Sequence, residues 1–117
     1  MSRRFTVSVD AMGGDFAPAE VVQGSVDAAR EMDIALKLAG AKDAIEAELA
    51  KLDTSGLDIA VIDAPDVIKD GEEPAMAVMR RPGSSVVVAT KMVKDGEADA
   101  VISAGSTGAF MVAAMQF

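Results

Sequence analysis

The sequence predicts an α/β fold, a mainly parallel sheet with helices on both faces. Short runs of apolar and β-branched residues alternate with segments of helical periodicity along the chain. Each apolar run ends at a turn that contains Gly, Ser or Pro. Half of the 117 residues are hydrophobic, which is enough for one core. Because parallel strands need helical crossovers, we expect a single α/β domain over residues 1–117.

Four short apolar runs are the expected strands. The first alternates apolar and polar residues and is rich in β-branched side chains, a pattern typical of strands. The strands are expected at residues 5–9, 34–38, 59–64 and 100–102.

The segments between the strands carry helix signals. Pro18 suits a first turn, Asp43 and Glu46 have the spacing of a capping box, and Gly96 is placed to end a helix at its C′ position. Helices are expected from Pro18 to Met32, from Asp43 to Leu52, from Pro74 to the break at residues 80–83, from Ser84 or Ser85 to Lys94, and over residues 109–117.

Small residues follow the strand ends and predict a binding crevice. Right-handed crossovers place the carboxyl ends of parallel strands at one edge of the sheet, where open α/β sheets bind ligands. We therefore expect residues 10–15, 64–66 and 103–108 to share one crevice. Around the last strand, Gly105, Ser106, Thr107 and Gly108 lead into a helix N-terminus, which attracts anions. The alternative is a plain tight turn in which Ser106 or Thr107 caps the helix.

Composition excludes several classes of function. The formal net charge is -8, which argues against nucleic-acid binding. The chain has no Cys and no His, so disulfides, thiol nucleophiles, zinc sites and Ser-His triads cannot be built within it. We expect no metal site and no cofactor, and a soluble protein.

Three blocks of sequence resemble one family. Residues 8–18 read Ser-Val-Asp-Ala-Met-Gly-Gly-Asp-Phe-Ala-Pro, residues 83–85 read Gly-Ser-Ser, and residues 103–109 read Ser-Ala-Gly-Ser-Thr-Gly-Ala. In this order and spacing they resemble the bacterial phosphate acyltransferases of phospholipid synthesis. That family more often has Asn at the position of Ser106. The resemblance runs over essentially the whole chain, which corresponds to about the first third of a typical member.

The resemblance implies a fold and an activity. It implies a fold like that of the isocitrate and isopropylmalate dehydrogenases, here truncated. It implies transfer of a fatty acyl group from acyl carrier protein to inorganic phosphate, by a cytoplasmic homodimer at the membrane surface. Membrane association could run through the downstream glycerol-3-phosphate acyltransferase. As the N-terminal fragment of a longer catalytic domain, the chain alone is expected to be marginally folded and inactive.

With the resemblance, two groups of residues become candidates, and each has a structural alternative. Gly13 and Gly14 would let the backbone approach the acyl phosphate or would simply form a tight turn. Asp10 and Asp15 would orient a donor or hold their loop through backbone N–H groups, and the second role is favoured. No residue is assigned a catalytic role.

Candidates around the third helix break are weaker. Ser84 and Ser85 are more often helix caps than ligands. Arg80 and Arg81 could contact phosphate or the acidic carrier protein, although a solvated surface pair is the default.

Two other functions remain open. A nucleotide-dependent enzyme is disfavoured, because neither G-x-G-x-x-G after the first strand nor a P-loop motif is present. An anion- or nucleotide-binding domain without acyl-transfer activity is the other alternative.

Overall fold

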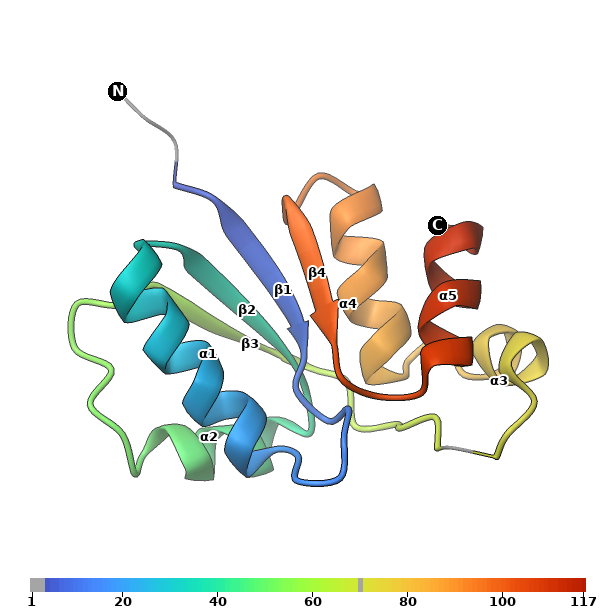
Figure 1. Cartoon of the computed structure of the whole chain (residues 1–117), viewed down its shortest axis with the longest axis horizontal. Coiled ribbons are helices and arrows are strands. Elements are labelled where there is room, and N and C mark those ends of the chain that lie inside the picture. Colours follow the sequence, from blue (N-terminus) through green and yellow to red (C-terminus); the bar gives the residue numbers. More distant parts are fainter. Residues whose placement is uncertain (1–3, 70) are drawn as a thin grey trace.

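The computed structural model describes residues 4–69 and 71–117. In this part of the chain four strands alternate with five helices, as Figure 1 shows. The elements are β1 (Thr6–Asp10), α1 (Ala19–Met32), β2 (Ala35–Gly40), α2 (Lys42–Leu49), β3 (Ile59–Asp63), α3 (Pro74–Arg80), α4 (Ser85–Lys94), β4 (Ala100–Ser103) and α5 (Thr107–Gln116). Each predicted strand and helix is present, with its ends shifted by up to three residues. Gly96 follows the C-cap of α4 with a positive φ of 77°, as its predicted C′ position requires.

The strands form one parallel sheet in the order β3-β2-β1-β4. The predicted α/β class and parallel sheet are therefore confirmed. β1 is central: its Val9 pairs with Leu38 of β2 on one side and with Ile102 of β4 on the other. The chain first steps outward from β1 to β2 and β3, and then returns to the opposite side of β1 for β4.

Helices cover both faces of the sheet, as predicted (Figure 1). On one face, Val9, Leu36 and Leu38 pack with Val22 and Val26 of α1, and Ile45 of α2 joins the same cluster. On the other face, Ala39 packs with Ala89 and Met92 of α4. The alternation of side chains along each strand explains this division, because neighbouring residues point to opposite faces.

Ser8 shows why the polar positions of β1 are not solvent-exposed. Its side chain lies on the α4 face and is fully buried. The Oγ donates a 2.7 Å hydrogen bond to the carbonyl oxygen of Ala89 in α4. This bond satisfies the buried hydroxyl and fixes α4 to the centre of the sheet.

The predicted capping box at α2 is wrong. The helix begins at Lys42, with Ala41 at the N-cap position and no side-chain cap. Instead the amide of Lys42 donates a 3.2 Å hydrogen bond to Oδ1 of Asp63 at the end of β3. A neighbouring strand therefore supplies the acceptor that the local sequence was expected to provide.

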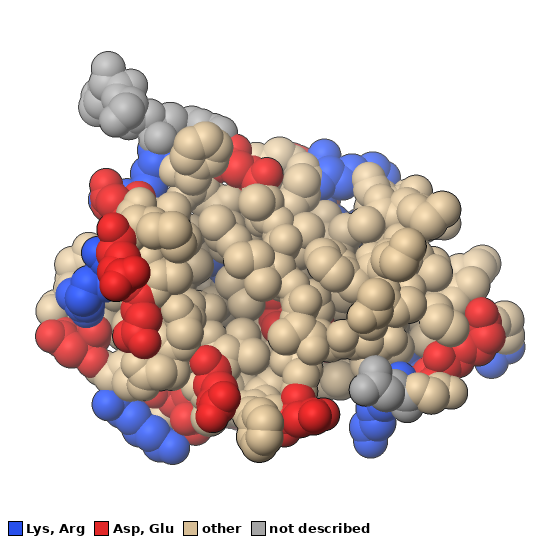
Figure 2. Space-filling model, viewed as in Figure 1, with Lys and Arg blue, Asp and Glu red and all other residues tan. Residues whose placement is uncertain are grey.

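Part of the β4 and α5 surface is apolar and exposed. Ile102 of β4 is 58% exposed, and Met111 and Met115 of α5 are 58% and 84% exposed. Figure 2 shows a broad uncharged area across the middle and right of this face, with acidic residues gathered along its left and lower margins.

Candidate functional site

The strand order creates a switch point between β1 and β4. The chain leaves β1 toward β2 on one side, whereas β4 is reached on the other side. At such a point the chain direction across the sheet reverses, and open α/β sheets bind ligands there, outside the carboxyl ends of the strands. The loops that carry Gly13 and Gly105 lie at this switch point.

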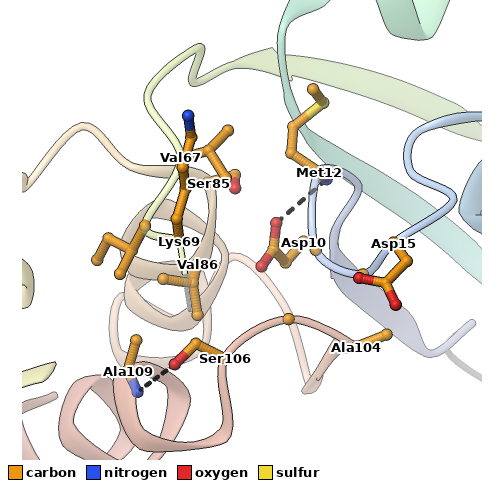
Figure 3. A pocket seen from close by; sticks show the side chains of 14 residues that line it. Asp10, Met12, Asp15, Val67, Lys69, Ser85, Val86, Ala104, Ser106 and Ala109 are labelled. Carbon is orange, nitrogen blue, oxygen red and sulfur yellow. Dashed lines mark hydrogen bonds between the residues drawn. The ribbon is translucent and has the colours of Figure 1, made fainter. Parts of the chain in front are cut away.

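A pocket of about 360 Å³ opens at this edge (Figure 3). The volume lies within the range of small-molecule sites. Its walls come from the loop after β1, the loop after β3, the N-terminus of α4, and the loop after β4 with the start of α5. The lining residues are Asp10, Met12, Gly13, Gly14, Asp15, Val67, Ile68, Lys69, Ser85, Val86, Ala104, Gly105, Ser106 and Ala109. Loops after the first, third and fourth strands therefore share one crevice, although the third contributes residues 67–69 and not 64–66.

Asp10 joins the two loops of the switch point. Its side chain is 3% exposed. Oδ2 accepts a 2.8 Å hydrogen bond from the hydroxyl of Ser103, and Oδ1 accepts one of 3.2 Å from the amide of Met12. The first bond fastens the end of β4 to the end of β1, and the second holds the loop after β1. Asp15, by contrast, is exposed at the pocket wall.

Gly13 and Gly105 are required by packing between the loops. A Cβ at Gly13 would lie 2.7 Å from the amide nitrogen of Gly105 and 2.8 Å from Oδ2 of Asp10. A Cβ at Gly105 would lie 3.2 Å from the Cα of Gly13. The amide of Gly105 already donates to Oγ of Ser103, at 3.2 Å. These two glycines let the loops touch each other, and the amide of Gly105 is not free for a ligand.

The predicted cradle at residues 105–108 is divided by the fold. Gly105 and Ser106 line the pocket, whereas Thr107 and Gly108 are absent from its lining. Gly108 faces α3, since a Cβ there would lie 2.7 Å from Cγ of Pro74. Ser106 is the N-cap of α5, and its Oγ accepts a 3.3 Å hydrogen bond from the amide of Ala109.

The N-terminus of α4 forms the opposite wall, and its two serines differ. Ser84 occupies the N-cap position, but its side chain makes no capping hydrogen bond, and its buried Oγ has no partner among the described residues. Ser85 lines the pocket with Val86. Two helices of ten residues thus direct their N-termini, the positive ends of their dipoles, toward one cavity.

The two N-cap serines are expected to differ in how their replacement by alanine changes the free energy of unfolding. We expect Ser106→Ala to lower the free energy of unfolding by about 1 kcal/mol, because the capping bond to Ala109 is lost. Ser84→Ala is expected to leave it unchanged or to raise it, because no capping bond is lost and an unpartnered buried hydroxyl is removed. Urea unfolding of both variants tests this pair. Equal destabilisation by both would contradict it.

Sequence reasoning missed the cation of the pocket. Among the described residues that line it, Lys69 is the one basic side chain. It lies in the loop after β3, and reading that loop onward from residue 66 would have found it. Arg81 instead holds this loop: it donates to the carbonyl oxygen of Val67 at 2.9 Å and forms a 3.1 Å ion pair with Glu72. Arg81 is therefore a structural clamp, and Arg80 is absent from the pocket lining.

Comparison with known proteins identifies the family. A family model described as "Fatty acid synthesis protein" matches residues 5–117. The chain belongs to this family. It is 47% identical over 109 residues to the phosphate acyltransferase of Pelotomaculum thermopropionicum, covering 93% of this chain and 32% of that protein. It is 50% identical over 105 residues to the Clostridium kluyveri phosphate acyltransferase, covering 90% of this chain and 31% of that protein.

A third relative has the same name. The Geobacter sulfurreducens phosphate acyltransferase is 50% identical over 109 residues, with 93% of this chain and 32% of that protein covered. The chain therefore spans about a third of the length of the curated relatives it matches. The resemblance noted from the sequence motifs is confirmed.

In the described part of the chain, no helix has the length and hydrophobicity needed to cross a membrane.

Proposed function

We propose that this chain contributes the phosphate-binding part of an enzyme that transfers a fatty acyl group from acyl carrier protein to inorganic phosphate. The observation that carries the proposal is the pocket at the β1–β4 switch point, toward which the N-termini of α4 and α5 converge. Helix N-termini favour anions through their unpaired amides and their dipoles. The family and the names of the relatives support acyl transfer to phosphate as the reaction.

The chemistry suits a chain that lacks Cys and His. A phosphate oxygen attacks the thioester carbonyl carbon, a C–O bond forms, the C–S bond breaks, and the thiol leaves as a thiolate. A substantial fraction of inorganic phosphate is already dianionic at neutral pH, and a thiol of pKa about 8.5 is an acceptable leaving group. The enzyme must mainly position the reactants and stabilise the tetrahedral oxyanion, which backbone amides can do.

Several finer features belong to the same proposal. The four-strand unit is proposed to be part of an isocitrate dehydrogenase-like fold. The enzyme is proposed to work as a cytoplasmic homodimer, with acyl carrier protein as donor and with peripheral membrane association through the downstream glycerol-3-phosphate acyltransferase. The confirmed parallel sheet is compatible with the first of these.

A chimera provides the test. Residues 5–117 of this chain would replace the matching segment of the Geobacter sulfurreducens phosphate acyltransferase, which is 50% identical over this region. We expect acyl phosphate to form from acyl carrier protein thioester only when phosphate is present. A folded chimera that binds phosphate but forms no acyl phosphate would instead support the anion-binding domain without acyl-transfer activity.

Lys69 is expected to strengthen phosphate binding in this chimera. Lys69→Ala should raise the KM for phosphate several-fold and weaken its dependence on salt, because a cation is removed from the pocket wall. The matched control is Lys51→Ala, which removes an exposed lysine paired with Glu48 on α2. Steady-state kinetics at two salt concentrations measure both variants. An unchanged KM in Lys69→Ala would show that the lysine does not reach the anion.

A further inference from the structure

The wall of the pocket at α4 contains a largely buried serine whose hydroxyl has no partner among the described residues. Ser85 is 2% exposed, and its amide donates to the carbonyl oxygen of Asp66 at 2.9 Å. Ser85 lines the pocket, and its hydroxyl forms no hydrogen bond with the residues that the structure describes. Buried hydroxyls are normally hydrogen-bonded. A polar ligand in the cavity would supply the missing partner.

The chemistry around Ser85 favours an anion on this side. Ser85 is the first residue of α4, and Val86 beside it also lines the pocket. The Ser85 amide is taken by Asp66, but because the side chain of Ser84 does not cap the helix, the next amides of the first turn keep their ability to bind an acceptor. A hydroxyl and uncapped amides together form a set of donors directed at one place.

The opposite wall presents an acceptor. Asp10 lines the same cavity from the end of β1, and Figure 3 shows its carboxylate across the pocket from the Ser85 hydroxyl. A carboxylate repels an anion that carries no proton. An anion with one hydroxyl group avoids that repulsion, since the hydroxyl can donate to the carboxylate in a short, strong hydrogen bond.

We propose that the pocket selects the monoprotonated form of phosphate, with its bare oxygens at Ser85 and the α4 N-terminus and its P–OH group donating to Asp10. This inference rests on the proposed function and names the ionic form of its substrate. It distinguishes phosphate from sulfate, which has the same shape and the same charge as the monoprotonated form of phosphate but no proton to donate. In this proposal Asp10 provides the selectivity for phosphate over sulfate, and Ser85 and the N-terminus of α4 provide the affinity for either anion.

The test uses the chimera with phosphate and sulfate as matched ligands. We expect the inhibition constant of sulfate to exceed the KM for phosphate at least tenfold. Ser85→Ala should raise the KM for phosphate about tenfold, the typical cost of one hydrogen bond to a charged group, with the KM for the acyl donor unchanged. Asp10→Asn should bring the inhibition constant of sulfate closer to the KM for phosphate, because an amide can donate a hydrogen bond to sulfate. The control is Ser25→Ala, whose hydroxyl donates only to Val21 of its own helix.

A second measurement separates this inference from the proposed function. Phosphate should raise the melting temperature of the chimera more than sulfate does at equal ionic strength; Asp10→Asn should reduce this difference, and Ser85→Ala should reduce the stabilisation by both anions. If phosphate stabilises the chimera in this way but no acyl phosphate forms, the inference about the ionic form of phosphate stands and the proposed acyl transfer is wrong. If acyl phosphate forms but sulfate binds as tightly as phosphate, or Ser85→Ala behaves like the parent, the inference is overturned. The absence of any phosphate-specific stabilisation would also overturn it.

Discussion

Gly13→Ala is expected to lower the free energy of unfolding by about 1–3 kcal/mol, the usual cost of overpacking, and to abolish acyl transfer in the chimera. The added Cβ would lie 2.7 Å from a backbone nitrogen of Gly105 and 2.8 Å from the Asp10 carboxylate. Neither atom can move freely, because the Gly105 amide is bonded to Ser103 and Asp10 is bonded to Ser103 and Met12. The two loops must therefore separate, and the pocket between them changes shape.

Gly24→Ala is the matched control for this change. Gly24 lies inside α1, where a Cβ meets no other atom within 4 Å. Alanine is favoured over glycine in helices, so the free energy of unfolding of this variant should rise by up to about 1 kcal/mol. Urea unfolding followed by circular dichroism measures both variants. Equal unfolding midpoints for Gly13→Ala and the parent would contradict the account of the loop contact.

Asp10→Ala is expected to have the second large effect. It leaves two hydrogen-bond donors, the Ser103 hydroxyl and the Met12 amide, without their acceptor in a part-buried region. Each stranded donor costs about 1–3 kcal/mol, and the ends of β1 and β4 lose the residue that joins them. We therefore expect a loss of at least 1–2 kcal/mol in unfolding free energy, with acyl transfer in the chimera reduced at least tenfold.

Asp27→Ala is the control for Asp10→Ala. Asp27 also accepts a side-chain hydrogen bond, 3.1 Å from Gln23, but this pair is exposed on α1. Exposed pairs of this kind contribute little, so the change should stay within about 0.5 kcal/mol. Thermal unfolding of the two variants compares the same residue type in two environments. A similar effect at both positions would rule out the joining role of Asp10.

The elements of the fold could be predicted because their signals are local. The alternation in residues 5–9, the breaks at Pro65 and Pro82, and Gly96 after α4 each follow from short-range preferences of the backbone. The failed capping box at Asp43 shows the limit of this reasoning. Its place was taken by Asp63, which is distant in sequence and reaches α2 only through the pairing of β2 with β3.

The site was predicted in outline, and its details depend on contacts between distant segments. That strand-end loops would meet follows from parallel topology. The order of the strands does not follow from it, because the sequence pattern does not determine which strands lie beside β1. This order brings Gly13 onto Gly105 and Asp10 onto Ser103, about ninety residues apart. For the same reason, the sequence alone did not show that Gly13 and Gly105 also pack against each other, or that Ser85 and not Ser84 lines the pocket.

We propose that phosphate binds between the N-termini of α4 and α5 at the β1–β4 switch point. The most direct test is a crystal structure of the chimera soaked with arsenate, a phosphate analogue whose arsenic atom is located by anomalous scattering. We predict one strong peak in the pocket, within hydrogen-bond distance of the Ser85 hydroxyl and close to Asp10. Ordered arsenate bound elsewhere in an active chimera, with this pocket empty, would contradict the account.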